Sequence, residues 1–181
     1  LHENSVTFEG EFYAVEDFRL EPPTPRPPRL LVGGGGVERD GDRFVPDPIK
    51  ERIRRHSDGW VARAEQPAIL DGDWADISDY LAQADHDPTT YDRVALQRAY
   101  LVPGADESVA LEKQRRVFDE KADAEVAMEQ YLTGTVEQVR AEIERYRDLG
   151  FDQLILDPVT HDPADAASQL RLYEDHLGDL I

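Results

Sequence analysis

The pattern that most constrains the fold is an alternation of short apolar runs with longer amphipathic segments, repeated four times from residue 29 onward. The short runs predict strands over residues 29–32, 59–62, 93–102 and 151–156. Parallel strands need a crossover between them, and a helix is its usual form. The sequence therefore predicts an α/β fold with four strand–helix units.

The first three helices have start signals of different strength. Asp47 followed by Pro48 marks the beginning of the first helix, because proline is well suited to the first helical turn. The apolar spacing predicts a second helix over residues 74–84 and a third over residues 106–131.

The last two helices have clearer ends. Thr135 and Gln138 have the spacing of a capping box, and Gly150 ends the helix that follows. Asp162 and Pro163 predict the start of the final helix. Its predicted apolar face consists of Ala167, Leu170, Tyr173 and Leu177.

The first 28 residues have a different texture. Residues 6–15 alternate around a Glu-Gly pair, which predicts a β-hairpin, and residues 21–28 are rich in proline, which favours an extended arm. We therefore expect a hairpin and arm over residues 1–28 and one α/β domain over residues 29–181.

The charge balance excludes some partners. Asp and Glu number 39 against 20 Lys and Arg, so the formal net charge is −19, which disfavours binding to nucleic acid or to an anionic membrane surface. Only three of the basic residues are lysines. Adaptation to high salt and a merely acidic mesophilic protein are both compatible with this composition.

Several kinds of chemistry are excluded or disfavoured by residue usage. The chain has no cysteine, so thiolate metal sites, disulfides and cysteine nucleophiles are excluded. Its five histidines have no metal-ligand spacing, so we expect no metal. Neither a membrane-spanning run nor a signal peptide is visible, and we expect a soluble, cytoplasmic protein with no membrane partner.

Four glycines form the main candidate binding motif. Gly33, Gly34, Gly35 and Gly36 follow a predicted strand directly, at a place where bare backbone N–H groups can approach a phosphate. The motif is neither a Walker A loop nor a dinucleotide fingerprint. A flexible turn is the alternative interpretation.

Other polar residues lie close to predicted strand ends. Arg63 follows the second strand and is a candidate phosphate ligand, or a solvated surface arginine. Within the third strand, one of Gln97 and Arg98 must point inward, where it contacts a ligand or completes a buried network. His161 follows the fourth strand and is more readily a polar loop residue than a catalytic one.

Five short motifs in order resemble the C-terminal half of the bacterial-luciferase-like superfamily of flavin- and deazaflavin (F420)-dependent oxidoreductases. They are residues 7–13 (TFEGEFY), 27–34 (PPRLLVGG), 57–61 (SDGWV), 134–139 (GTVEQV) and 149–152 (LGFD). The resemblance covers nearly the whole chain. It implies that the four strands are the last four of a (β/α)8 TIM barrel.

The resemblance also implies roles for particular residues. Gly33–Gly36 match the loop that accepts the phosphate of FMN or F420, and Arg63 is similar in placement to basic residues beside that loop. Asp58, Gly59 and Trp60 match a motif that we assign to packing and strand entry. The enzymes of this family act on small organic substrates.

Length is the main departure from the family. A complete barrel takes about 250 residues, and the first half, which in the family carries much of the ring-facing pocket and commonly the catalytic acid or base, is missing here. No catalytic residue can therefore be assigned. We expect a fragment or one part of a split gene, which forms a homo-oligomer or depends on an N-terminal half.

Four functions stay open at this point. The first is the C-terminal part of an FMN-dependent monooxygenase, and the second is an F420-dependent oxidoreductase that transfers hydride. A non-catalytic half-barrel that associates with itself is the third. An unrelated acidic scaffold would require the five motifs to be coincidental.

Overall fold

The computed structural model describes residues 5–19, 21, 26, 28–63, 65–104, 109, 112, 131–158, 160 and 162–180 of the chain. Contacts divide the chain into two compact units, Leu1–Leu30 and Leu31–Ile181. The helix predicted over residues 106–131 lies outside the described residues apart from Val109, Glu112 and Tyr131. His161 and most of the proline-rich segment also lie outside them.

The first unit contains the predicted hairpin. Strand β1 (Val6–Glu9) pairs antiparallel with β2 (Ala14–Phe18), and the Gly10 N–H donates to the Tyr13 carbonyl across the turn. Both strands are exposed along their whole length. The hairpin prediction is confirmed, with β2 extending beyond the predicted end.

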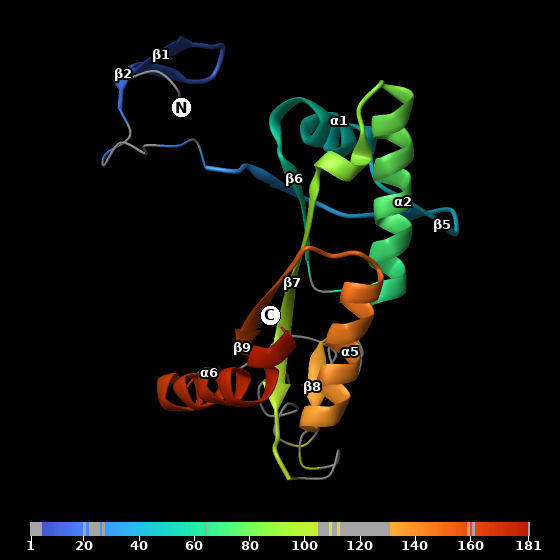
Figure 1. Cartoon of the computed structure of the whole chain (residues 1–181). Coiled ribbons are helices and arrows are strands. Elements are labelled where there is room, and N and C mark those ends of the chain that lie inside the picture. The colour runs from blue at the N-terminus through green and yellow to red at the C-terminus, as the bar shows by residue number, and fades with distance from the viewer. Residues whose placement is uncertain are drawn as a thin grey trace. The chain divides into compact units, whose positions relative to one another are not determined.

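The second unit is built on a parallel sheet. Its strands are β3 (Leu31–Gly33), β6 (Gly59–Ala62), β7 (Asp92–Leu101), β8 (Leu132–Gly134) and β9 (Gln153–Pro158). The long strand β7 pairs with β6, β8 and β9, and β6 pairs with β3, all in parallel. Figure 1 shows β7 running through the unit with β9 and the short β8 on either side.

The four predicted strands are confirmed, with ends shifted by a residue or two. The register places β3, β6, β7 and β9 side by side in chain order, as in consecutive strands of a barrel. The short β8 was not predicted, because three residues are too few to show a periodicity. The sequence-based expectation of an α/β fold is correct.

Helices α1 (Asp47–His56), α2 (Pro67–Gln83), α5 (Val136–Asp148) and α6 (Pro163–Leu177) connect or follow the strands. Single turns of 3-10 helix occur at η1 (Pro88–Thr90) and η2 (Gly178–Leu180). The capping box of α5 is present, with the Thr135 N–H donating to Gln138 Oε1 at 2.8 Å. Helix α2 begins at Pro67, earlier than predicted, because that proline occupies its first turn.

A second hairpin, which the sequence analysis missed, follows the glycine run. Strand β4 (Val37–Arg39) pairs antiparallel with β5 (Asp42–Phe44). Asp40 and Gly41 form the turn with φ of 56° and 90°. Asp-Gly is a strong signal for this turn, so the hairpin could have been predicted.

The core lies between the sheet and its helices. Trp60 of β6 is fully buried and stacks on Trp74 of α2, with ring centroids 6.0 Å apart, so the predicted packing role of Trp60 is confirmed. On α6 the predicted face is partly wrong, since Ala167 is exposed and Leu170 is 55% exposed, whereas Tyr173 and Leu177 are buried. Gln169 is buried instead, and its amide bonds the backbone N–H and carbonyl of Leu101.

Candidate functional site

The carboxyl ends of β3 and β6 lie at one edge of the sheet. Gly33 pairs with Val61 in parallel register, so the glycine run and Arg63 leave the sheet side by side. In α/β sheets and barrels this is the edge where ligand sites form, because the loops that follow the strands converge there. The structure therefore brings together two features that are far apart in the sequence.

Gly34 is a packing residue. Its φ is +148°, and a Cβ would lie 2.9 Å from Cγ2 of Ile49 on α1. The Trp60 indole N–H donates to the Gly34 carbonyl at 2.6 Å, which fixes the loop against the helix side of β6. These contacts explain a glycine at this position without any ligand.

Gly36 already contacts an anion that belongs to the chain. Its backbone N–H donates to Oδ2 of Asp73 at 2.7 Å, and Asp73 is only 2% exposed. Arg43 of β5 donates to the same carboxylate from Nε at 2.8 Å and from a terminal nitrogen at 3.0 Å. The Asp73 carboxylate raises the pKa of Arg43 through these bonds.

A side chain at Gly36 would overlap Asp73 and Arg43. The fourth glycine is therefore needed for the close approach of the carboxylate. The donor set of one backbone N–H and a guanidinium fork is suited to an oxyanion, and Asp73 occupies it.

Two of the predicted residues have space around them. A Cβ at Gly33 would lie 3.7 Å from Val61 Cγ1, which is an ordinary contact. Arg63 is exposed, and within the described part of the chain it makes no hydrogen bond or ion pair. Gly35 has less space than Gly33 and more than Gly36, because a Cβ at Gly35 would lie 3.1 Å from Asp73 Oδ2.

Strand β7 places Gln97 and Arg98 on opposite faces of the sheet. Gln97 is fully buried and donates to the Glu65 carbonyl at 2.7 Å and to the Tyr146 hydroxyl of α5. Arg98 is exposed on the other face and lies beside Asp157 of β9. Burial raises the pKa of the Tyr146 hydroxyl, so it stays protonated and donates to the Glu65 carbonyl. Gln97 thus belongs to a buried network through its amide nitrogen, while its Oε1 has no hydrogen-bond partner in the described residues.

Arg93 at the start of β7 is held by aromatic rings. Its guanidinium lies 5.0 Å from the Trp74 ring centroid and 4.8 Å from that of Phe151, and burial lowers its pKa. Asp71 is 3.7 Å away. This residue belongs to the amino end of the sheet, where polar clusters in barrels serve stability.

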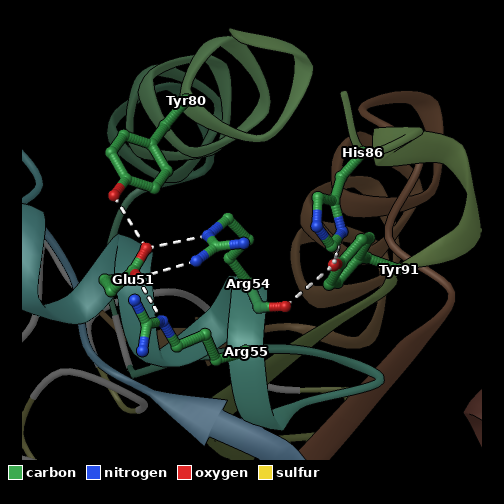
Figure 2. Close-up of polar contacts among 6 residues, drawn as sticks. All are labelled: Glu51, Arg54, Arg55, Tyr80, His86 and Tyr91. Carbon is green, nitrogen blue, oxygen red and sulfur yellow. Dashed lines mark hydrogen bonds and ion pairs between the residues drawn. The ribbon is translucent and has the colours of Figure 1, made fainter. Parts of the chain in front are cut away.

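A second polar cluster joins α1 and α2 at that same end (Figure 2). Glu51 accepts hydrogen bonds from Arg54, Arg55 and the Tyr80 hydroxyl. These hydrogen bonds hold the pKa of Glu51 well below its usual range, and the bond from Arg54 has the largest effect. His86 Nδ1 lies 2.9 Å from the Tyr91 hydroxyl next to this cluster. The arrangement ties helices α1 and α2 together through Glu51 and Tyr80.

The described residues contain no group of three or more acidic or histidine side chains that could hold a metal ion. In the same part of the chain no helix is long and apolar enough to cross a membrane.

Comparison with known proteins finds no matching family model and no matching curated protein. Solved structures do match. An F420-dependent secondary alcohol dehydrogenase superposes with a TM-score of 0.69 at 15% identity, over 96% of this chain and 55% of the other. The fold of this chain matches half of a TIM barrel.

Other matches to this half-barrel belong to both cofactor classes. The F420-dependent tetrahydromethanopterin reductase from Methanopyrus kandleri matches with a TM-score of 0.61 at 13% identity, over 94% of this chain and 56% of that one. The oxygenating constituent of 3,6-diketocamphane monooxygenase from Pseudomonas putida, in complex with FMN, matches with a TM-score of 0.59 at 17% identity, over 98% and 58%. The chain spans about half the length of these enzymes.

Proposed function

We propose that this chain supplies half of a flavin- or deazaflavin-dependent oxidoreductase that acts on a small organic substrate. FMN is the cofactor in the first form of the proposal, with monooxygenation as the reaction, and F420 with hydride transfer is the alternative. The proposal keeps residues 1–28 as a hairpin and arm and residues 29–181 as the half-barrel domain.

The match over nearly the whole chain to enzymes of both cofactor classes is the observation that carries this proposal. The carboxyl edge adds support, because it presents Gly33 and Arg63 on adjacent strands. Arg63 has no competing partner in the described residues, so its guanidinium is available to a phosphate.

The hydrogen-bond donors near this edge support the assignment of a phosphate site. The neighbouring Gly36 N–H and Arg43 already bind the Asp73 carboxylate, a stand-in anion, so the loop geometry suits an oxyanion. We assign the cofactor phosphate to Gly33, Gly35 and Arg63, while Gly34 and Gly36 shape the loop. When bound, the cofactor would supply the redox chemistry, as the partner that exchanges electrons or hydride with the substrate.

Cofactor titration tests the proposal. We expect FMN or F420 to bind the full chain saturably, measured by fluorescence, and Arg63→Gln to weaken that binding by about 10-fold or more, the scale of one charge-assisted contact. Gly33→Asp should weaken it as well by adding a negative charge where space is open. Riboflavin, which lacks the phosphate, should respond to neither substitution.

Arg171→Gln on the exposed side of α6 is the matched control, since it removes the same charge elsewhere. Gly34→Asp is a poor test, because Ile49 leaves no room for it. If a folded chain binds neither FMN nor F420, the proposed function is wrong.

A non-catalytic half-barrel that associates with itself is the second candidate. Leu96 and Ile155 are 38% and 45% exposed on paired strands, and among the described residues β9 pairs only with β7. Such edges and apolar faces favour association. Light scattering in molar salt should give the mass of a dimer if this candidate is correct, and a monomer would exclude it.

A further inference from the structure

The face of the sheet opposite to helix α5 carries two neighbouring side-chain pairs. One pair is polar and the other is apolar. Side chains alternate along a strand, so Leu96 and Arg98 share the face opposite to the buried Gln97. The register pairs Leu96 with Ile155 and Arg98 with Asp157. All four side chains are accessible to solvent, at 38%, 45%, 47% and 55% exposure in the order Leu96, Ile155, Arg98 and Asp157.

The polar pair is the one nearer to the carboxyl edge. Arg98 and Asp157 come two residues after Leu96 and Ile155 in parallel strands, so they lie closer to the edge where barrel sites form. The strands β3, β6, β7 and β9 contain two basic residues, Arg93 and Arg98. Arg93 is engaged with Trp74 and Phe151, so Arg98 is the basic residue that this face offers.

Neither member of the pair is saturated by the other. Nε of Arg98 lies 3.9 Å from Asp157 Oδ2, which is an ion pair but too long for a hydrogen bond. One terminal nitrogen of Arg98 donates to the Tyr131 hydroxyl at 3.2 Å, and the guanidinium lies 5.3 Å from that ring centroid. Tyr131 therefore orients the guanidinium while Arg98 keeps donors, and Asp157 acceptors, for another group.

We propose that Arg98 and Asp157 recognise the pyrimidinedione edge of a flavin or deazaflavin ring. That edge presents a carbonyl, an N3–H and a second carbonyl, so a guanidinium donor beside a carboxylate acceptor complements it. Arg98 donates to a ring carbonyl and Asp157 accepts the N3–H. Leu96 and Ile155 supply the apolar surface for the ring.

This inference rests on the proposed function and adds ring recognition to it. FMN and F420 share this edge, so the pair serves either cofactor. A guanidinium beside the ring also favours the negative charge that the reduced ring carries, because charge-assisted hydrogen bonds are the stronger ones. The ring site is separate from the phosphate residues Gly33 and Arg63.

Phosphate-free ring analogues test the inference directly. Lumiflavin and N3-methyl-lumiflavin differ only in the N3–H, and we expect the full chain to bind the first about 10-fold more tightly, because the methylated ring leaves Asp157 without its donor. Asp157→Ala should bring the two dissociation constants together. Arg98→Gln should weaken both analogues, and Arg98→Lys should recover part of the loss.

The ion pair of Arg140 with Asp179 provides a matched control. It joins the same residue types, with a nitrogen–oxygen distance of 2.6 Å, and it does not lie on this face of the sheet. Asp179→Ala should preserve the discrimination between the analogues. Asp157→Leu keeps the branched shape of the side chain, has no acceptor, and serves if Asp157→Ala does not fold.

The inference would be overturned if the wild type bound lumiflavin and N3-methyl-lumiflavin equally tightly. It would also be overturned if a folded Asp157 variant kept the wild-type preference for lumiflavin. In either case Arg98 and Asp157 would form an ion pair with no role in ring binding. That result is distinguishable from failure of the proposed function, in which FMN and F420 also fail to bind.

Discussion

The carboxylate of Asp73 accepts the backbone N–H of Gly36 at 2.7 Å, so the glycine loop of this half-barrel holds an anion from its own chain. The sequence places these residues on different elements, and only the packing of α2 beneath the loop brings them together. Arg43 completes the site with two further hydrogen bonds to the same carboxylate. The loop is thus partly a structural clamp.

Replacing Asp73 should destabilise the chain strongly. Asp73→Ala removes one partner of a buried ion pair and leaves the Arg43 guanidinium and the Gly36 N–H unsatisfied, so we expect a loss of about 3 kcal/mol in the free energy of unfolding. Formate or phosphate should restore part of it by filling the vacated position. Urea unfolding with and without these anions measures both effects. Rescue of wild type to the same extent would argue against a specific anion position.

Gly34 should tolerate no side chain while Ile49 is present. Gly34→Ala places a methyl group 2.9 Å from Ile49 Cγ2 in a backbone conformation with φ of +148°, and we expect a loss of about 2 kcal/mol in unfolding free energy. Gly33→Ala is the control and should leave the unfolding free energy unchanged or raise it by about 1 kcal/mol or less, because alanine suits a strand better than glycine does. Combining Gly34→Ala with Ile49→Ala separates the two causes, because only the steric part can be relieved by the second change.

Acid should weaken the Glu51 cluster. Hydrogen bonds from Arg54 and Tyr80 hold the pKa of Glu51 below that of an unfolded chain, so the unfolded state binds the proton more readily. The stabilisation is therefore present above the unfolded pKa of about 4.3 and is lost as the pH falls below it. In unfolding curves between pH 3 and pH 7, Glu51→Gln should show a shallower loss of stability toward acid than the wild type. An unchanged slope would mean that the pKa of Glu51 does not differ between the folded and unfolded states, and it would contradict the prediction.

Salt should stabilise the chain. A net charge of −19 repels itself in dilute buffer, and molar KCl screens that repulsion. Each kcal/mol gained should raise the melting temperature by about 2–4 °C. Thermal unfolding at KCl concentrations from dilute to molar checks this, with sucrose as a control for general solvent exclusion. A melting temperature that falls with salt would show that attractive ion pairs outweigh the net repulsion.

Local signals predicted the elements well. The capping residues Thr135 and Gln138 and the Asp162 cap of α6 depend only on neighbours in the chain, and the structure has them as expected. Leu170 shows the limit of this reasoning. Helical spacing placed it on the buried face, but Gln169 takes that place because its amide satisfies the backbone of Leu101.

The candidate site could be predicted only in outline. The glycine run and Arg63 were found because each directly follows an apolar run, and the parallel register does place them at one edge. Asp73 and Arg43 were missed because no local pattern marks an aspartate on a helix as the partner of a glycine loop. The Asp-Gly turn of β4 and β5 was the one signal that could have pointed to Arg43.

By itself, the sequence determined the order of strands and helices, the parallel class of the sheet and the acidic surface, since these follow from periodicity, caps and charge within short stretches of chain. The tertiary structure decided which polar groups meet. It placed Gln97 against Tyr146 of α5 and Arg98 beside Asp157. It also brought the Asp73 carboxylate to the backbone N–H of Gly36. The physical reason is that strand register and helix packing join residues far apart in the chain, and a pattern of neighbours does not encode those distances.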